Sequence, residues 1–185
     1  PEALTTAGVG DIVQAFVAAT ARALAAGFEV IEIHAAHGYL LHEFLSARTR
    51  PGKFGGDLAG RSRILRTIIE RVRADYPELL IGVRLSIFDV IPFGPGEKFG
   101  RPLSFDKLLP YRYGFGVNAD NPLEPDLSEP IRLLRVLKEL GVAAVNLSCG
   151  SPYYNPHVQR PAIFPPSDGY QPPEDPLVSV CRQIH

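Results

Sequence analysis

Apolar residues recur along this chain with two different spacings, which alternate. Apolar residues three and four positions apart predict helices that bury one face. Short apolar runs rich in β-branched residues predict strands. The predicted helices cover residues 11–26 and 58–75 and begin again near 128 and 176, and the predicted strands cover 28–34, 79–85 and 142–148.

Capping residues mark the expected ends of these helices. Asp11 is a candidate N-cap of the first helix, and Gly27 is placed to end it in a left-handed conformation. Ser128, followed by Pro130, is typical of a helix start, and Gly141 of the same helix's end.

The regular alternation of helices and strands predicts a parallel sheet built from right-handed βαβ units. An open doubly wound sheet and a (β/α)8 TIM barrel both fit such an order. No Gly-rich phosphate-binding turn follows any strand, whereas polar side chains with useful chemistry follow all three, within 34–39, 84–86 and 146–150. Because a barrel gathers its active site from several strand ends, this pattern favours the barrel.

The length allows only part of a barrel. A closed barrel takes about 250 residues, and this chain of 185 supplies three β/α units. We expect residues 1–185 to be one partial barrel domain that belongs to a larger enzyme or pairs with another chain, because open sheet edges need cover.

Two Pro-rich stretches interrupt the alternation, an insertion at 87–126 and a loop at 150–175. The aromatic residues of the insertion are expected either to form a lid over the site or to pack on the barrel exterior. For the tyrosines of the second loop, packing is the favoured interpretation, and shaping of a substrate pocket is the alternative.

Composition narrows the class of partner. The chain has 45% hydrophobic and 21% charged residues and a net charge of −1, so it is globular and has no basic field for nucleic acid or an anionic membrane. No apolar run reaches the roughly 20 residues that span a bilayer. Cys149 and Cys181 lie too far apart for a zinc knuckle. We expect a cytoplasmic protein that acts on a small molecule.

His34, His37 and Tyr39 directly follow the first predicted strand. Two imidazoles on one turn could bind a single acceptor oxygen, and a nearby phenol could deliver a proton beside it. The residues alone equally allow His37 and His42 to be a helix-start and a helix-surface residue. A metal site is a third interpretation, but a third ligand at suitable spacing is missing.

Arg84 is a charged residue at the end of a strand that is otherwise apolar. Such a charge needs a partner. Pairing with Glu32 on the neighbouring strand is slightly favoured by the residues alone, and an anionic ligand at the barrel mouth is the alternative.

The residues now on the page resemble a known family. The stretch AGFEVIEIHAAHGYLLHEFLS at 26–46 closely resembles the fourth-strand signature of the old yellow enzyme family, the FMN-dependent NAD(P)H:flavin oxidoreductases. Residues 54–58 with Arg61 and Arg63 resemble that family's next helix start, and 82–86 its fifth strand.

The resemblance implies a function. His34 and His37 would hold the substrate carbonyl, or a phenolate in the oxidised enzyme, and Tyr39 would protonate the carbon next to that carbonyl. Arg84 would lie against the N1/C2-carbonyl side of FMN. The implied reaction reduces an activated C=C bond by hydride transfer from flavin N5, with NAD(P)H as electron donor.

The family's first three and last two strands have no counterpart in this chain, so the remainder of the barrel or a homo-oligomer is the expected partner. Two alternatives stay open. One is a flavin-independent barrel lyase or isomerase that uses His34 and Arg84. The other is an inactive truncated fragment.

Overall fold

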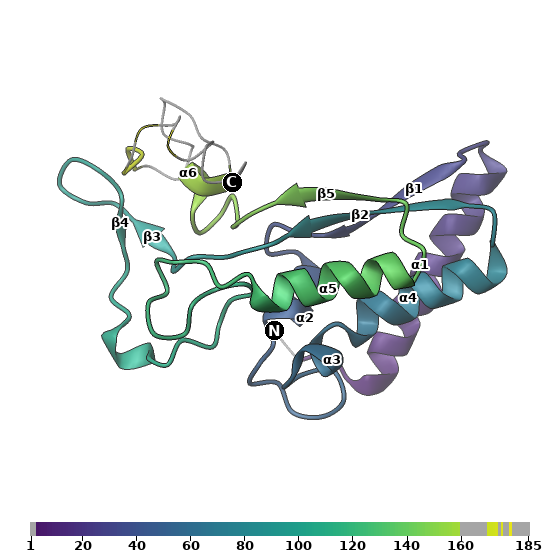
Figure 1. Ribbon diagram of the computed structural model, residues 1–185, viewed down its shortest axis with the longest axis horizontal. Helices are drawn as coiled ribbons and strands as arrows, with labels where there is room; N and C mark the ends of the chain where they lie inside the picture. Colours follow the sequence, from purple (N-terminus) through teal and green to yellow (C-terminus); the bar gives the residue numbers. More distant parts are fainter. Residues whose placement is uncertain (1–2, 160–169, 174, 176–177, 179–185) are drawn as a thin grey trace.

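The computed structural model describes residues 3–159, 170–173, 175 and 178. β1 (Val30–Ala35), β2 (Leu80–Ser86) and β5 (Ala144–Ser148) form a parallel sheet in the order β1-β2-β5 (Figure 1). All three predicted strands are confirmed, each starting one or two residues later than expected. The predicted helix near residue 176 falls almost wholly outside the described residues, as does part of the loop at 150–175.

The three long helices, α1 (Thr6–Ala25), α4 (Arg63–Asp75) and α5 (Ser128–Glu139), lie on one face of the sheet (Figure 1). Odd-numbered strand residues point into this layer, because side chains alternate along a strand. Ile33 and Leu85 of the sheet pack there with Ile68 of α4 in the main core. Even-numbered strand residues therefore emerge on the opposite face.

The first helix begins earlier than its sequence pattern predicts. Thr5, not Asp11, is its N-cap, and the Thr5 hydroxyl accepts a hydrogen bond from the Gly8 N–H at 3.0 Å. The extra turn forms because Val9 is buried in the main core. The predicted end at Gly27 is confirmed by its φ of 87°.

Two further helices differ from the boundaries that the sequence predicts. The helix predicted over 58–75 is two, α3 (Leu58–Arg61) and α4, separated at Ser62. Ser128 does not cap α5; it is the first helical residue, and its N–H donates to the Asp126 carboxylate at 3.0 Å. At the start of α5, the Asp126 carboxylate thus accepts the N–H hydrogen bond in place of the Ser128 hydroxyl that the sequence predicts as the cap.

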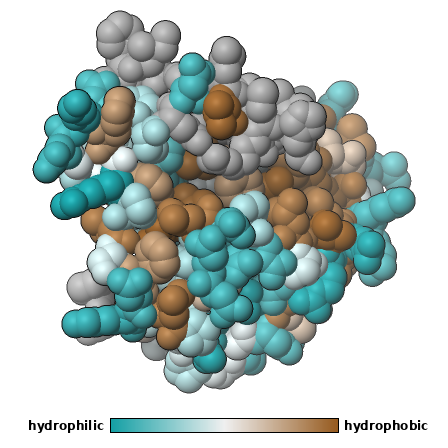
Figure 2. Space-filling model, turned by 60° about the vertical axis from the view of Figure 1, so that its left-hand side comes forward, coloured by the Kyte–Doolittle hydropathy of each residue, from teal (hydrophilic) through white to brown (hydrophobic). Residues whose placement is uncertain are grey.

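The insertion contains only short elements: β3 (Phe93–Gly94), β4 (Arg101–Pro102) and η1 (Asp106–Leu108). Phe115 is fully buried in the main core, and Phe88 is buried in a smaller cluster, so these aromatics pack. On the side of the molecule where the insertion lies, apolar residues reach the surface between polar ones (Figure 2). Phe99 and Leu103 are among the exposed apolar residues of the insertion.

The face opposite the long helices carries the polar strand residues and is open. Val30 and Leu80 point to this side and are 54% and 51% exposed. The sheet is therefore the predicted incomplete barrel of three β/α units, with its inner face uncovered in the part that the structure describes. None of the helices in that part is both long and apolar enough to cross a membrane.

Candidate active site

His34 and Arg84 lie side by side across two strands. They are register partners in the β1–β2 pair, and Arg84 is in turn the partner of Asn146 on β5. Partners on adjacent parallel strands point to the same face of a sheet. The imidazole and the guanidinium therefore share the open face, near the carboxyl ends of their strands.

His37 follows β1 in a left-handed conformation with φ of 63°, which is costly for a residue that carries a Cβ. Two serines hold it there. Its N–H donates to Ser86 Oγ at 3.0 Å, and its Nε2 lies 2.6 Å from Ser148 Oγ. Because these serines end β2 and β5, the turn is tied to both neighbouring strands.

The three predicted catalytic side chains form one cluster. The ring of His34 lies 5.3 Å from that of His37 and 5.3 Å from that of Tyr39, between centroids. The Tyr39 hydroxyl is half-exposed and lies 2.9 Å from the hydroxyl of Tyr153. Two imidazoles and a phenol thus converge where the sequence predicts them.

Electrostatics favours neutral imidazoles. Burial and, next, the Arg84 charge lower the pKa of His34, with Glu32 opposing them. Burial, followed by the Arg84 and His34 charges, lowers the pKa of His37 to about 4. A neutral imidazole keeps one N–H, which suits hydrogen bonding to a carbonyl oxygen.

Arg84 is not paired with Glu32, so the pairing favoured from the residues alone is wrong. The Glu32 carboxylate instead accepts a hydrogen bond from Asn146 Nδ2 at 3.3 Å. The Arg84 Nε is buried and has no hydrogen-bond partner among the described residues. A buried guanidinium donor without an acceptor is costly. It fits a ligand with an electron-rich edge, such as the N1/C2-carbonyl side of a flavin.

Sequence reasoning missed three residues of this cluster. Ser86 and Ser148 stood within the polar strand ends but had no assigned role, and their position opposite His37 depends on sheet register. Tyr153 was expected to pack, yet it is 62% exposed and meets Tyr39. A tyrosine in an exposed, Pro-rich loop was the only available signal.

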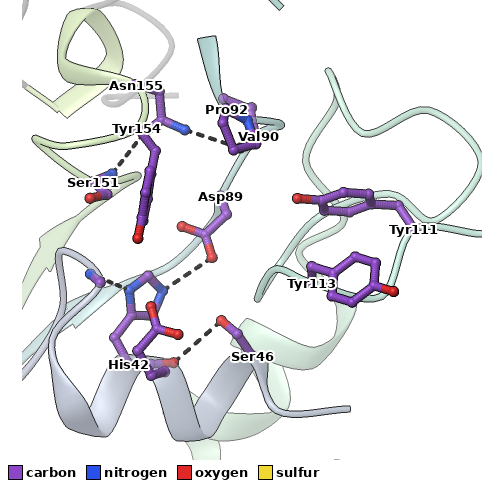
Figure 3. A pocket seen from close by; sticks show the side chains of 12 residues that line it. His42, Ser46, Asp89, Val90, Pro92, Tyr111, Tyr113, Ser151, Tyr154 and Asn155 are labelled. Atoms are coloured by element: carbon purple, nitrogen blue, oxygen red, sulfur yellow. Dashed lines mark hydrogen bonds and ion pairs between the residues drawn. The ribbon is translucent and has the colours of Figure 1, made fainter. Parts of the chain in front are cut away.

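A pocket of about 250 Å³ is lined by Gly38, the residue between His37 and Tyr39, and by side chains that include Asp89 and Tyr111 (Figure 3). His42 on α2 (Leu40–Ser46) lines it and is 3% exposed, so the alternative that His42 is a helix-surface residue is wrong. Burial raises the pKa of Glu43, and burial with the Asp89 charge raises that of Tyr111 to about 12. The pocket therefore disfavours additional negative charge. The described residues contain no cluster of three side chains suited to a metal ion.

Comparison with known proteins decides the family. A sequence model described as the NADH:flavin oxidoreductase / NADH oxidase family matches residues 1–99, more than half of the chain. The chain belongs to this family. The resemblance to old yellow enzymes is confirmed, and FMN with NAD(P)H is the cofactor pair expected of the family.

Curated relatives agree with this assignment. An NADPH dehydrogenase of Halalkalibacterium halodurans is 32% identical over 175 residues, which cover 94% of this chain and 40% of the relative. An NADPH dehydrogenase of Clostridium acetobutylicum is 44% identical over 153 residues, covering 81% and 36%. This chain thus spans about two fifths or less of these relatives.

Solved structures of the family share the fold. The old yellow enzyme homologue from Zymomonas mobilis is 25% identical with a TM-score of 0.56, covering 82% of this chain and 36% of that one. Morphinone reductase in complex with tetrahydroNAD is 26% identical with a TM-score of 0.56, covering 80% and 34%. The parallel β/α units of this chain are therefore part of the TIM barrel of this family.

Proposed function

We propose that this chain carries the carbonyl-binding and proton-donating half of an FMN-dependent active site that reduces activated C=C bonds. One observation carries the proposal. The rings of His34, His37 and Tyr39 cluster on the face to which Arg84 presents a buried guanidinium nitrogen without a partner among the described residues. The whole protein would act as an NAD(P)H-dependent oxidoreductase on a small molecule.

The two imidazoles would bind the substrate. Both have lowered pKa values, so each is neutral near pH 7 and can direct an N–H at the carbonyl oxygen of an enone. Negative charge grows on this oxygen when the β-carbon receives a hydride, and the hydrogen bonds strengthen as it does. FMN, once reduced by NAD(P)H, would supply that hydride.

Tyr39 would complete the reaction as general acid. Tyr39 is 49% exposed, and its proton would pass to the carbon next to the carbonyl. The enolate oxygen then re-forms the C=O bond, the electron pair of the enolate C=C bond forms the new C–H bond, and the tyrosinate takes a proton from solvent. Tyr153 touches the Tyr39 hydroxyl at 2.9 Å and would orient it. Arg84 would hold the N1/C2-carbonyl edge of the flavin through its guanidinium, whose Nε has no hydrogen-bond partner among the described residues.

The family match argues against a flavin-independent lyase or isomerase. Activity of the 185-residue chain by itself is a separate matter, which titration with FMN followed by anaerobic NADPH would test. Saturable binding and bleaching of the flavin would exclude an inert fragment.

The Tyr39→Phe variant of the FMN-loaded protein tests the proposal. With NADPH and 2-cyclohexen-1-one, the rate of enone reduction should fall about 10²- to 10⁴-fold. Flavin reduction by NADPH, and reoxidation by ferricyanide, should not change, because neither needs a proton delivered to carbon. Tyr154→Phe is the matched control and should retain enone reduction. Unchanged enone reduction by Tyr39→Phe would refute the role of Tyr39.

A further inference from the structure

Two consecutive residues in the turn between His34 and Tyr39 are left-handed. His37 has a φ of 63° and Gly38 of 75°. The His37 N–H is accepted by Ser86, and the Gly38 N–H is accepted by Nδ1 of His42 at 2.8 Å. Side chains from two different elements thus hold adjacent peptide groups of one strained turn.

His42 is suited to hold Gly38 but not to touch substrate. It is 3% exposed and lies on α2, behind the turn (Figure 3). A side chain at this position would be crowded as well as left-handed, since a Cβ built on Gly38 would lie 3.2 Å from the Ser151 hydroxyl. The turn is therefore held at two adjacent N–H groups, by Ser86 and by His42.

Asp89 favours a proton on Nε2 of His42, which in the neutral ring leaves Nδ1 to accept this hydrogen bond; burial lowers the pKa of His42, but the Asp89 and Glu43 charges outweigh it and raise that pKa. Nδ1 accepts from Gly38, so the ring proton must lie on Nε2. Nε2 faces Asp89 Oδ2 at 3.2 Å, a contact without the alignment of a full hydrogen bond. The same Oδ2 accepts the Phe115 N–H at 2.9 Å, which anchors the carboxylate to the insertion.

We propose that His42, with Asp89 selecting its tautomer, is a positioning residue that sets the turn presenting His37 and Tyr39 to the substrate. This inference rests on the proposed function, because it assigns a purpose to the geometry of those two side chains. The buried imidazole of His42 connects the loop after β1 to the loop after β2. β2 is the strand that carries Arg84.

Two substitutions of similar size separate positioning from packing. In His42→Asn, the amide oxygen can replace Nδ1 as the acceptor for Gly38 but cannot reach Asp89. In His42→Gln, the longer amide can reach Asp89 but leaves the Gly38 N–H without its acceptor. Loss of one hydrogen bond weakens amide protection about ten-fold. Amide hydrogen exchange of Gly38 should therefore accelerate about ten-fold in His42→Gln and much less in His42→Asn.

The turnover rate should fall in the same order, more in His42→Gln than in His42→Asn. His42→Gln should lower kcat for 2-cyclohexen-1-one about ten-fold or more while NADPH-driven flavin reduction stays unchanged, and His42→Asn should restore most of the loss. Equal damage by both variants, or unchanged Gly38 exchange in His42→Gln, would overturn the proposal.

Asp89→Asn provides a test that does not depend on activity or on either His42 variant folding. If its amide oxygen takes the place of Oδ2, that oxygen keeps the Phe115 N–H and still faces Nε2, but without the negative charge that favours a proton there. Long-range ¹H–¹⁵N spectra of the neutral ring should show Nε2–H in the unsubstituted protein and a smaller share of Nε2–H in Asp89→Asn, because an amide oxygen attracts that proton less than a carboxylate does. A dominant Nδ1–H form in the unsubstituted protein would refute the positioning contact, even if the Tyr39 experiment supports the proposed function.

Discussion

His34 and Arg84 are register partners on adjacent parallel strands, and this pairing brings an imidazole and a guanidinium to one face of the sheet. The guanidinium lowers the pKa of His34, after burial, and so favours an imidazole that donates without carrying charge. One pairing of strands therefore couples the proposed flavin contact to the proposed carbonyl contact.

The titration of His37 is the first prediction. Its pKa is lowered to about 4 from the ordinary 6.5, so ¹⁵N NMR of the FMN-free protein should show a midpoint near 4. In Arg84→Met the pKa should rise, because a repelling positive charge is removed. A midpoint near 6.5 in the unsubstituted protein would contradict the described environment.

The same shift gives stability a pH dependence. The unfolded chain binds a proton at His37 near pH 6.5 but the folded chain only near pH 4. Between these values the unfolded state binds more protons, so the contribution of His37 to the free energy of unfolding is present above pH 6.5 and lost as pH falls toward 4. Chemical denaturation between pH 6.5 and 4 should show that the free energy of unfolding falls less in His37→Asn than in the unsubstituted protein.

Much of this site was predictable because it depends on local rules. Period-two alternation puts His34 and Arg84 at corresponding places on strands, and parallel strands bring their carboxyl ends to one edge. The left-handed conformation of His37 was not predictable, since only a small fraction of histidines adopt it. It exists because Ser86, far along the chain, offers an acceptor.

Ser86→Ala should therefore destabilise the protein by about 1–3 kcal/mol, because it leaves the buried N–H of His37 without its acceptor. Urea denaturation measures the change. Ser46→Ala is the control: its hydroxyl donates to His42 O at 3.3 Å in a partly buried place, so a loss within about 0.5 kcal/mol is expected. Equal losses would show that Ser86 does not hold the turn.

Arg61 should be important for stability rather than chemistry. It is 0% exposed, and its NH2 group lies 2.7 Å from both carboxylate oxygens of Glu129 at the start of α5. Arg61→Met removes the fully buried partner of a largely buried carboxylate and leaves the Leu45 and Gly56 carbonyls without their donor, so it should cost about 3–5 kcal/mol. Arg48 contacts the same carboxylate at 2.8 Å but is 32% exposed, so Arg48→Met should cost about 1 kcal/mol or less. Similar losses in the free energy of unfolding for the two variants would contradict the structural role assigned to Arg61.

Tyr153→Phe removes the hydroxyl that contacts Tyr39 at 2.9 Å. The oxidative half-reaction with 2-cyclohexen-1-one should slow several-fold, about the effect of one hydrogen bond, and much less than in Tyr39→Phe. Stopped-flow absorbance of the flavin follows this step. No change in rate would mean that Tyr153 does not orient the proton donor.

The residues that sequence reasoning missed are those whose partners are distant along the chain. Tyr153 meets Tyr39 across 114 positions, and His42 meets Asp89 only because α2 packs beside the loop after β2. A buried histidine on a short helix looks like a surface residue when its partner is unknown. The unpaired Nε of Arg84 could likewise be recognised only after Glu32 was found to face Asn146.

The most direct measurement is a crystal structure of the FMN-loaded protein with p-nitrophenol bound. The account predicts a phenolate oxygen within about 3 Å of a ring nitrogen of both His34 and His37, and the Arg84 guanidinium against the N1/C2-carbonyl edge of the flavin. A phenolate bound away from both imidazoles, or a flavin that does not contact Arg84, would contradict it.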